Sequence, residues 1–155
     1  MHIRILMVGK QGRGPWRELT LDYEKRIKRY TPFSLESVKE VKLSNQTAEQ
    51  VKAREAASLL QRLESQEMVV ALDKGGEPWS SERVARFLGD LDLVSSPRVS
   101  FIVGGPFGLD KRILQAAQTR LSLSAMTFPH DMATVILLEQ LYRGFTILQN
   151  EQYHK

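Results

Sequence analysis

The chain has 155 residues, of which 42% are hydrophobic and 26% charged, and a net charge of +4; this composition is typical of one folded domain and excludes wholesale disorder. It contains no cysteine and only three scattered histidines, which excludes disulfides and thiolate chemistry and predicts no metal site. The longest apolar run, Met68–Leu72, is too short to span a membrane and the first residues lack the apolar region of a signal peptide, so we expect a cytoplasmic protein with no membrane partner.

Apolar strands and amphipathic helices alternate along the first half of the chain. Ile3–Val8 predicts a short strand, and a glycine-rich loop leads from it to a helix over Trp16–Tyr30. Phe33–Val41 alternates roughly between apolar and polar residues, as a half-buried strand does. Thr47–Gln50 resembles a capping box, which predicts that a helix begins at Thr47 and runs to about Glu64.

The second half continues this alternation. Met68–Leu72 is wholly apolar, which is the pattern of a strand covered on both faces, and Val99–Val103 predicts a second covered strand. The remaining predicted elements are a turn over Asp73–Pro78, a helix from a cap at Ser80 or Ser81 to Leu88, a helix over 111–119 capped by Asp110, a strand over Leu121–Phe128 and a helix over 132–148 capped by Asp131.

The last predicted helix has almost no polar face. A helix that is apolar nearly all round is buried on more than one side. In a domain of this size we expect a second copy of the chain to bury part of this apolar surface, so we predict a homodimer. The apolar residues of this helix are Met132, Val135, Ile136, Leu137, Leu138, Leu141, Tyr142 and Phe145.

Strands that alternate with helices predict a single α/β domain with a mostly parallel sheet flanked by helices. In open sheets of this kind, ligands bind beyond the carboxyl ends of the strands, which predicts a pocket around residues 72–78, 104–108 and 123–130. The dinucleotide motif GxGxxG and the phosphate loop GxxxxGK[ST] are both absent, which disfavours nicotinamide and nucleoside triphosphate chemistry.

The positive charge is concentrated in the first part of the chain. Residues 1–62 contain 13 Lys or Arg against 7 Asp or Glu, whereas residues 63–155 contain 9 against 11. A basic half beside a near-neutral half is typical of a polyanion-binding surface joined to a separate pocket, although a solvated helix face gives the same pattern. The residues that we expect to contact a nucleic acid are Lys10, Arg13 and Arg17.

Two loops at the predicted pocket carry residues suited to binding. Gly104 and Gly105 follow an apolar strand, and without Cβ atoms they let backbone amides approach a ligand, although a tight strand-to-helix turn needs the same residues. The stretch 123–130 is rich in hydroxyl and small side chains and ends in His130. This histidine is either a catalytic base or a residue that lies beside the helix cap and has no catalytic role.

Several segments of the chain form a distinctive combination. They are IRILMVGK at 3–10, ALDKGGEPWSSE at 71–82, GGPFGL at 104–109, LSLSAMTFPHDMATVILLEQLYRGFTI at 121–147 and the ending Tyr153-His154-Lys155. Together they resemble the RlmH family of SPOUT-class methyltransferases over essentially the whole chain. Position 107 is variable in the family, so Phe107 is compatible with the resemblance. Lys155, however, stands where a terminal Arg is expected.

The resemblance implies a homodimer with a deep trefoil knot in a cofactor-binding half, about residues 66–155, and an RNA-facing half, about residues 1–65. It implies that S-adenosylmethionine (SAM) is the cofactor and that the substrate is N3 of pseudouridine 1915, in helix 69 of 23S ribosomal RNA on the ribosome. Two alternatives stay open: another SPOUT RNA methyltransferase acting on a ribose 2′-oxygen or on tRNA, and a non-catalytic ribosome-associated RNA-binding factor.

The resemblance also assigns residues to roles. N3 of a uracil-like ring must lose a proton before it attacks a methyl group, and His130 is the first candidate base because imidazole titrates near neutral pH. Arg143 is suited to stabilise the resulting anion, although Glu139 four residues earlier could pair with it instead. The residues implicated in substrate handling are His130, Arg143, Tyr153 and His154. The residues implied to contact the cofactor are Leu72, Gly104, Gly105, Leu123, Ser124, Ala125, Met126, Thr127 and Phe128.

Overall fold

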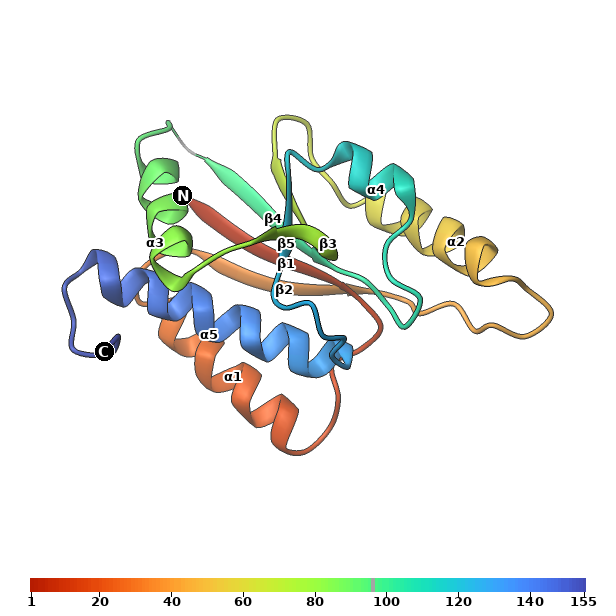
Figure 1. The fold of residues 1–155 in the computed structure, drawn as a ribbon, viewed down its shortest axis with the longest axis horizontal. Coiled ribbons are helices and arrows are strands. Elements are labelled where there is room, and N and C mark those ends of the chain that lie inside the picture. The colour runs from red at the N-terminus through yellow and green to blue at the C-terminus, as the bar shows by residue number, and fades with distance from the viewer. Residues whose placement is uncertain (96) are drawn as a thin grey trace.

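A five-stranded parallel sheet with helices on both faces forms the centre of the molecule (Figure 1). The computed structural model describes residues 1–95 and 97–155. In chain order the elements are β1 His2–Val8, α1 Pro15–Ile27, β2 Phe33–Val38, α2 Ala48–Leu60, β3 Met68–Pro78, α3 Ser81–Asp92, β4 Arg98–Val103, α4 Lys111–Ala116, β5 Thr119–Ser122 and α5 His130–Leu148.

The strand order is β2-β1-β4-β3-β5, and every pair of neighbouring strands is parallel. This confirms the predicted α/β class and sheet. Strand β1 of the basic half lies between β2 and β4. The two halves of the chain therefore share one sheet, and the carboxyl ends of all its strands meet at one edge.

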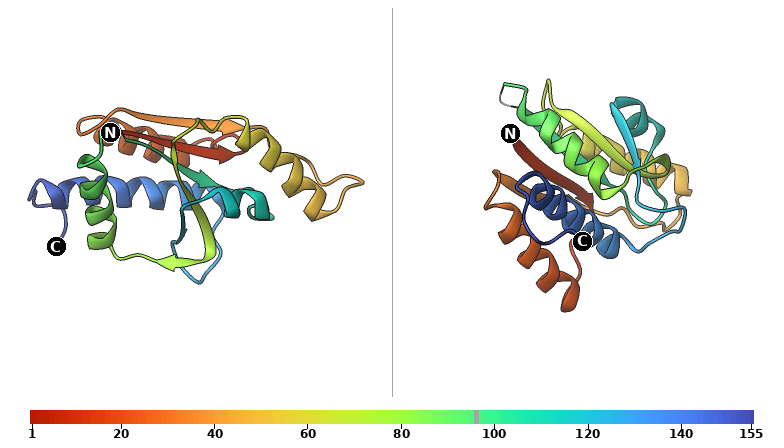
Figure 2. Two further views of the ribbon diagram at one scale, coloured as in Figure 1. Left: turned by 90° about the horizontal axis from the view of Figure 1, so that it is seen from above. Right: turned by 60° about the vertical axis from the view of Figure 1, so that its left-hand side comes forward.

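Each face of the sheet has its own apolar core. On one face Ile3, Ile5 and Met7 of β1 pack with α1, α3 and α5; on the other, Leu6 and Val8 pack with α2 and α4. This alternation follows from the strand geometry, which sends successive side chains to opposite faces. Helix α5 lies between α1 and α3 (Figure 2), which explains why so much of its surface is apolar.

Local capping signals predicted several helix starts correctly. The Thr47 hydroxyl accepts a hydrogen bond from the Gln50 amide at 3.2 Å, and the Gln50 side chain accepts one from the Thr47 amide at 2.9 Å. Ser80 caps α3 and Asp110 caps α4. The cap predicted at Asp131 is wrong, because α5 begins one residue earlier.

The predicted turn over Asp73–Pro78 and the predicted strand over Leu121–Phe128 are also wrong. Strand β3 continues to Pro78, because a register shift after Leu72 lets Glu77 and Pro78 pair again with β5. Strand β5 ends at Ser122, and the hydroxyl-rich stretch that follows is a loop. The other boundaries differ by a few residues: α1 ends at Ile27, β2 at Val38, α2 at Leu60, α3 at Asp92 and α4 at Ala116.

Within residues 1–95 and 97–155, no helix is both long and apolar enough to cross a bilayer. The same residues contain no group of three acidic or histidine side chains placed to hold a metal ion.

Candidate active site

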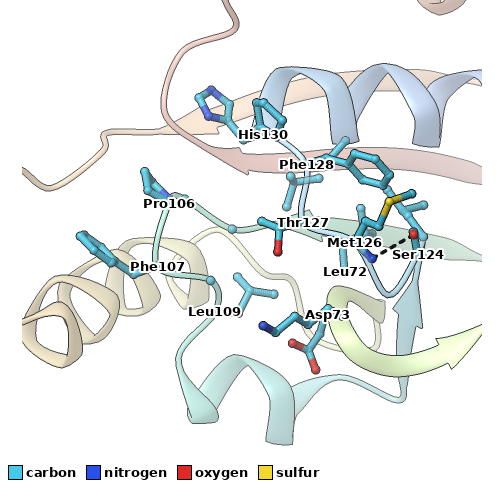
Figure 3. Close-up of a pocket in the computed structure, with 18 of the residues that line it drawn as sticks. Leu72, Asp73, Pro106, Phe107, Leu109, Ser124, Met126, Thr127, Phe128 and His130 are labelled. Carbon is cyan, nitrogen blue, oxygen red and sulfur yellow. Dashed lines mark hydrogen bonds between the residues drawn. The ribbon is translucent and has the colours of Figure 1, made fainter.

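A cavity of about 890 Å³ opens beyond the carboxyl ends of β4 and β5, beside the middle of β3 (Figure 3). Its walls come from the loops after β4 and β5 and from Leu72–Lys74 of β3, where the register of this strand shifts. A cavity of this size accommodates a nucleoside-sized ligand. The predicted cofactor residues that line it are Leu72, Gly104, Gly105, Leu123, Ser124, Met126, Thr127 and Phe128. Ala125 is exposed and does not line the cavity.

The glycine loop packs too closely against its surroundings to carry side chains. A Cβ atom on Gly104 would lie 3.0 Å from the backbone of Gly108 and from the side chain of Leu109. A Cβ atom on Gly105 would lie 3.3 Å from a carboxylate oxygen of Glu55. The turn closes through a hydrogen bond from the Gly108 amide to the Gly105 carbonyl at 3.0 Å, with Gly108 at φ +81°. The glycines therefore allow the loop to form one wall of the cavity.

The opposite wall is the loop after β5. The Ser124 hydroxyl accepts a hydrogen bond from the Met126 amide at 3.0 Å, and the Ser122 hydroxyl donates to the Ser124 carbonyl at 3.1 Å. The Met126 side chain is 69% exposed at the mouth of the cavity. Figure 3 shows Met126 and Ser124 on one side of the cavity and Pro106 and Phe107 on the other.

His130 begins α5 and lies at the rim on the side of Pro106 (Figure 3). Its Nε2 atom is buried and has no hydrogen-bond partner; the nearest carboxylate oxygen, from Asp131, is 3.3 Å away. Asp131 instead accepts a hydrogen bond from the Gly12 amide at 2.8 Å. This contact fastens the loop after β1 beside His130, and no local sequence pattern could have predicted it.

The predicted RNA-binding residues extend from that same region. Lys10 and Arg13 lie in the loop fastened by Asp131, and Arg17 lies in the first turns of α1. All three side chains are exposed, and none forms an ion pair with the residues that the structure describes. The structure therefore leaves these three positive charges exposed and without an acidic partner among the described residues.

Arg143, Tyr153 and His154 form a second group near the far end of α5. The Arg143 guanidinium pairs with Glu139 and lies 4.7 Å from the centre of the Tyr153 ring. The Tyr153 hydroxyl donates to Glu139 at 3.1 Å, and His154 Nε2 lies 3.1 Å from Glu82 of α3. The C-terminal tail is therefore docked on its own chain.

The two groups of predicted substrate-handling residues are well separated within one chain. His130 and Arg143 are 13 positions apart on α5, which corresponds to about 20 Å along a helix axis. The hydrogen bond to Glu139 raises the pKa of Arg143, which stays charged. Burial, followed by the contact with Tyr23, raises the pKa of Tyr153 well above its ordinary value, so its hydroxyl stays protonated near neutral pH.

Sequence reasoning missed Lys52 of α2, which lines the cavity. Lys74 of β3 and Phe107 of the glycine loop also line it, within the predicted ranges 72–78 and 104–108, and Phe107 is 41% exposed. Glu55 lies directly behind the glycine loop. Lys52 and Glu55 carry no signal in the sequence, because they reach this edge only through the packing of α2 against the sheet.

Comparisons with known sequences agree on one family. The sequence profile described as "Predicted SPOUT methyltransferase" matches residues 1–154. Ribosomal RNA large subunit methyltransferase H of Syntrophotalea carbinolica is 41% identical over 99% of both chains, and its counterpart in Acetivibrio thermocellus is 40% identical over the full length of both. The structure of a "Probable Methyltransferase" from Bordetella pertussis has a similar fold, with a TM-score of 0.55 at 16% identity, covering 92% of this chain and 95% of that one.

Proposed function

The chain belongs to the SPOUT methyltransferase family, and from that premise we propose that it methylates N3 of pseudouridine 1915, in helix 69 of 23S ribosomal RNA, with SAM as the methyl donor. The observation that carries the proposal is the cavity at the sheet edge, which is lined by residues of three segments that resemble the RlmH family, 71–82, 104–109 and 121–147. The relatives named as large-subunit ribosomal RNA methyltransferases support a ribosomal substrate acted on in the cytoplasm.

The chemistry of the cavity fits SAM. The glycine loop offers backbone groups that no Cβ atom shields, and Leu72, Leu109 and Phe128 offer apolar surface to an adenine ring. The carboxylate of Asp73, which also lines the cavity, already pairs with Arg120. When bound, SAM supplies a methyl group activated by a cationic sulfonium.

In the proposed reaction His130 accepts the N3 proton of the target base. Its imidazole stands at the rim, between the cavity and the basic loop, with a buried ring nitrogen that no protein group satisfies. A positioned base contributes on the order of 10²–10⁴-fold to a proton transfer. The loops on either side align the base with the methyl group, and such alignment contributes about 7–11 kcal/mol.

The proposed enzyme acts as a homodimer, since one chain holds only part of the substrate-handling set near its cavity. Arg143 stays charged and is suited to stabilise the N3 anion, but it lies about 20 Å along α5 from His130. Met132, Val135 and Ile136, at the cavity end of α5, are only partly buried in one chain. A second copy that covers this apolar face would bring Arg143, Tyr153 and His154 of one chain toward His130 of the other. The trefoil knot is a further part of this proposal.

RNA reaches the site along the basic half of the chain. Lys10, Arg13 and Arg17 are exposed, and Lys10 and Arg13 lie in the loop that Asp131 holds beside His130; in this proposal they neutralise phosphates next to the target base.

The direct test incubates the protein with methyl-labelled SAM and ribosomes from a strain that lacks this methylation. Mass spectrometry then maps the label. The proposal predicts label on N3 of pseudouridine 1915 alone. Label on a ribose 2′-oxygen or on tRNA would assign the protein to another SPOUT activity. If calorimetry detects no binding of SAM, the protein is instead a non-catalytic RNA-binding factor.

A further inference from the structure

Glu55 of α2 is a buried acidic side chain directly behind the glycine loop of the cavity. The residue is 2% exposed. Its Oε1 atom accepts a hydrogen bond from the Val41 amide at 3.1 Å. Both of its carboxylate oxygens lie within 3.5 Å of the position that a Cβ atom on Gly105 would occupy. Only the backbone of the glycine loop therefore separates this carboxylate from the cavity that Gly105 lines.

Glu55 has no cationic partner in the parts of the chain that the structure describes. Two other acidic side chains of this region do have one: Asp73, which lines the cavity, pairs with Arg120, and Asp110 pairs with Arg112 at 3.0 Å. The charged group that faces Glu55 is Glu40, which has the same sign. Burial, with a smaller contribution from Glu40, raises the pKa of Glu55 above its ordinary value.

A buried carboxylate without a positive partner is costly, because the interior cannot replace the water that solvates the charge. Such a group is expected where a ligand supplies the missing charge. A donor in this cavity carries a positive sulfonium, whereas the product left after methyl transfer, S-adenosylhomocysteine, has a neutral thioether at the same place. A carboxylate behind the cavity wall thus attracts the donor more strongly than the product.

We propose that Glu55 is the counter-charge for the sulfonium of the bound methyl donor and sets the preference of the cavity for donor over product. This inference rests on the proposed use of SAM. Glu55 acts through the field across the Gly105 backbone, so it is a specificity-determining residue and does not touch the reacting atoms. This preference favours the replacement of bound S-adenosylhomocysteine by SAM after each turnover.

The test compares the affinities for SAM and S-adenosylhomocysteine by calorimetric titration of the wild type and of Glu55→Gln, which removes the charge and keeps the shape. A unit charge that acts across the protein interior, where the effective dielectric constant is about 20, changes an affinity on the order of tenfold. We expect SAM binding to weaken by about that factor and product binding to stay unchanged. Glu55→Met, of similar size, provides a second removal of the charge, and thermal unfolding checks that each variant is folded.

Glu40→Gln is the matched control, because Glu40 is exposed and water screens its charge. Its ratio of donor to product affinity should equal that of the wild type. If Glu55→Gln weakens both ligands equally, Glu55 only shapes the loop and the inference is overturned; an unchanged ratio with unchanged affinities overturns it too. A wild-type protein that binds neither ligand would contradict the proposed function itself.

Discussion

His130 is the residue on which the proposed chemistry depends most. It joins the cavity to the basic loop through its neighbour Asp131, and its Nε2 atom has no hydrogen-bond partner in the protein. We predict that His130→Ala lowers the single-turnover rate of methyl transfer by about 10²–10⁴-fold, the usual contribution of a general base. SAM affinity, measured by calorimetry, should change little.

His2→Ala is the control for His130→Ala, since His2 lies in β1 and does not line the cavity. It should transfer methyl groups at the wild-type rate. A His130→Ala protein that is as fast as the wild type would remove this histidine from the mechanism.

Glu55 should lower the stability of the fold at neutral pH. Its pKa is raised in the folded protein from an ordinary value of 4.5, so the unfolded chain releases this proton at a lower pH than the folded chain does. Stability is therefore lost as the pH rises from the ordinary pKa through the raised one. We predict that Glu55→Gln is more stable than the wild type at about pH 8, and that the gain shrinks toward about pH 4.

Urea unfolding at both pH values measures this difference. A Glu55→Gln protein with the same advantage at both pH values would show that the buried charge is not its origin. A variant that is stabilised yet prefers SAM less would demonstrate that the carboxylate is kept for binding at the expense of stability.

At the scale of elements, one buried ion pair links the central strands to the start of β3. Arg4 of β1 donates to Ser100 of β4 at 2.8 Å and to Glu67, just before β3, at 2.7 Å. The Glu67 side chain is 4% exposed. Replacing Arg4 alone would leave this buried carboxylate without a positive partner, with hydrogen bonds only from the Ser100 hydroxyl and the Glu64 amide.

We predict that Arg4→Met lowers the free energy of unfolding by about 3–5 kcal/mol, the usual loss when one member of a buried pair is removed. Denaturant titration measures it. The double variant Arg4→Met with Glu67→Gln should recover a large part of the loss, because no unpaired charge remains. If the double variant is as unstable as Arg4→Met, packing of the arginine and not its charge holds the strands.

The sequence predicted those elements whose signals are local. The apolar run of β4 and the reciprocal bonds of Thr47 with Gln50 depend on residues a few positions apart. The second half of β3 could not be predicted in this way, because Glu77 and Pro78 become part of a strand only by pairing with β5. Asp131 fits a cap by its type, but a contact with Gly12, 119 positions away, uses its carboxylate.

At the scale of the whole molecule, the positions of the loops were predictable and the grouping of the catalytic candidates was not. A parallel sheet brings the loops after β4 and β5 to one edge, beside Leu72–Lys74 of β3, so the order of strands and helices was enough to indicate the cavity. That Arg143, Tyr153 and His154 dock together, away from His130, depends on tail contacts with Glu139 and Glu82 that no spacing reveals.

This separation predicts complementation between subunits. His130→Ala and Arg143→Ala should each be inactive as homodimers, because every site then lacks one residue. After the two are mixed and allowed to exchange subunits, about half of the dimers combine one chain of each, and each of those has one intact site.

The mixture should therefore regain about a quarter of the wild-type activity in the ribosome assay. A mixture that stays inactive after exchange, shown by mass spectrometry of intact dimers, would place both residues in the same chain's site or outside it.

The claim on which the whole account depends is that the cavity between the glycine loop and the loop after β5 holds the methyl donor. A crystal structure of the protein with SAM tests it most directly. The account predicts density for the donor between Gly105 and Leu123–Phe128, beside Leu72 and near His130. Density for SAM elsewhere on the molecule, or none at a saturating concentration, would contradict it.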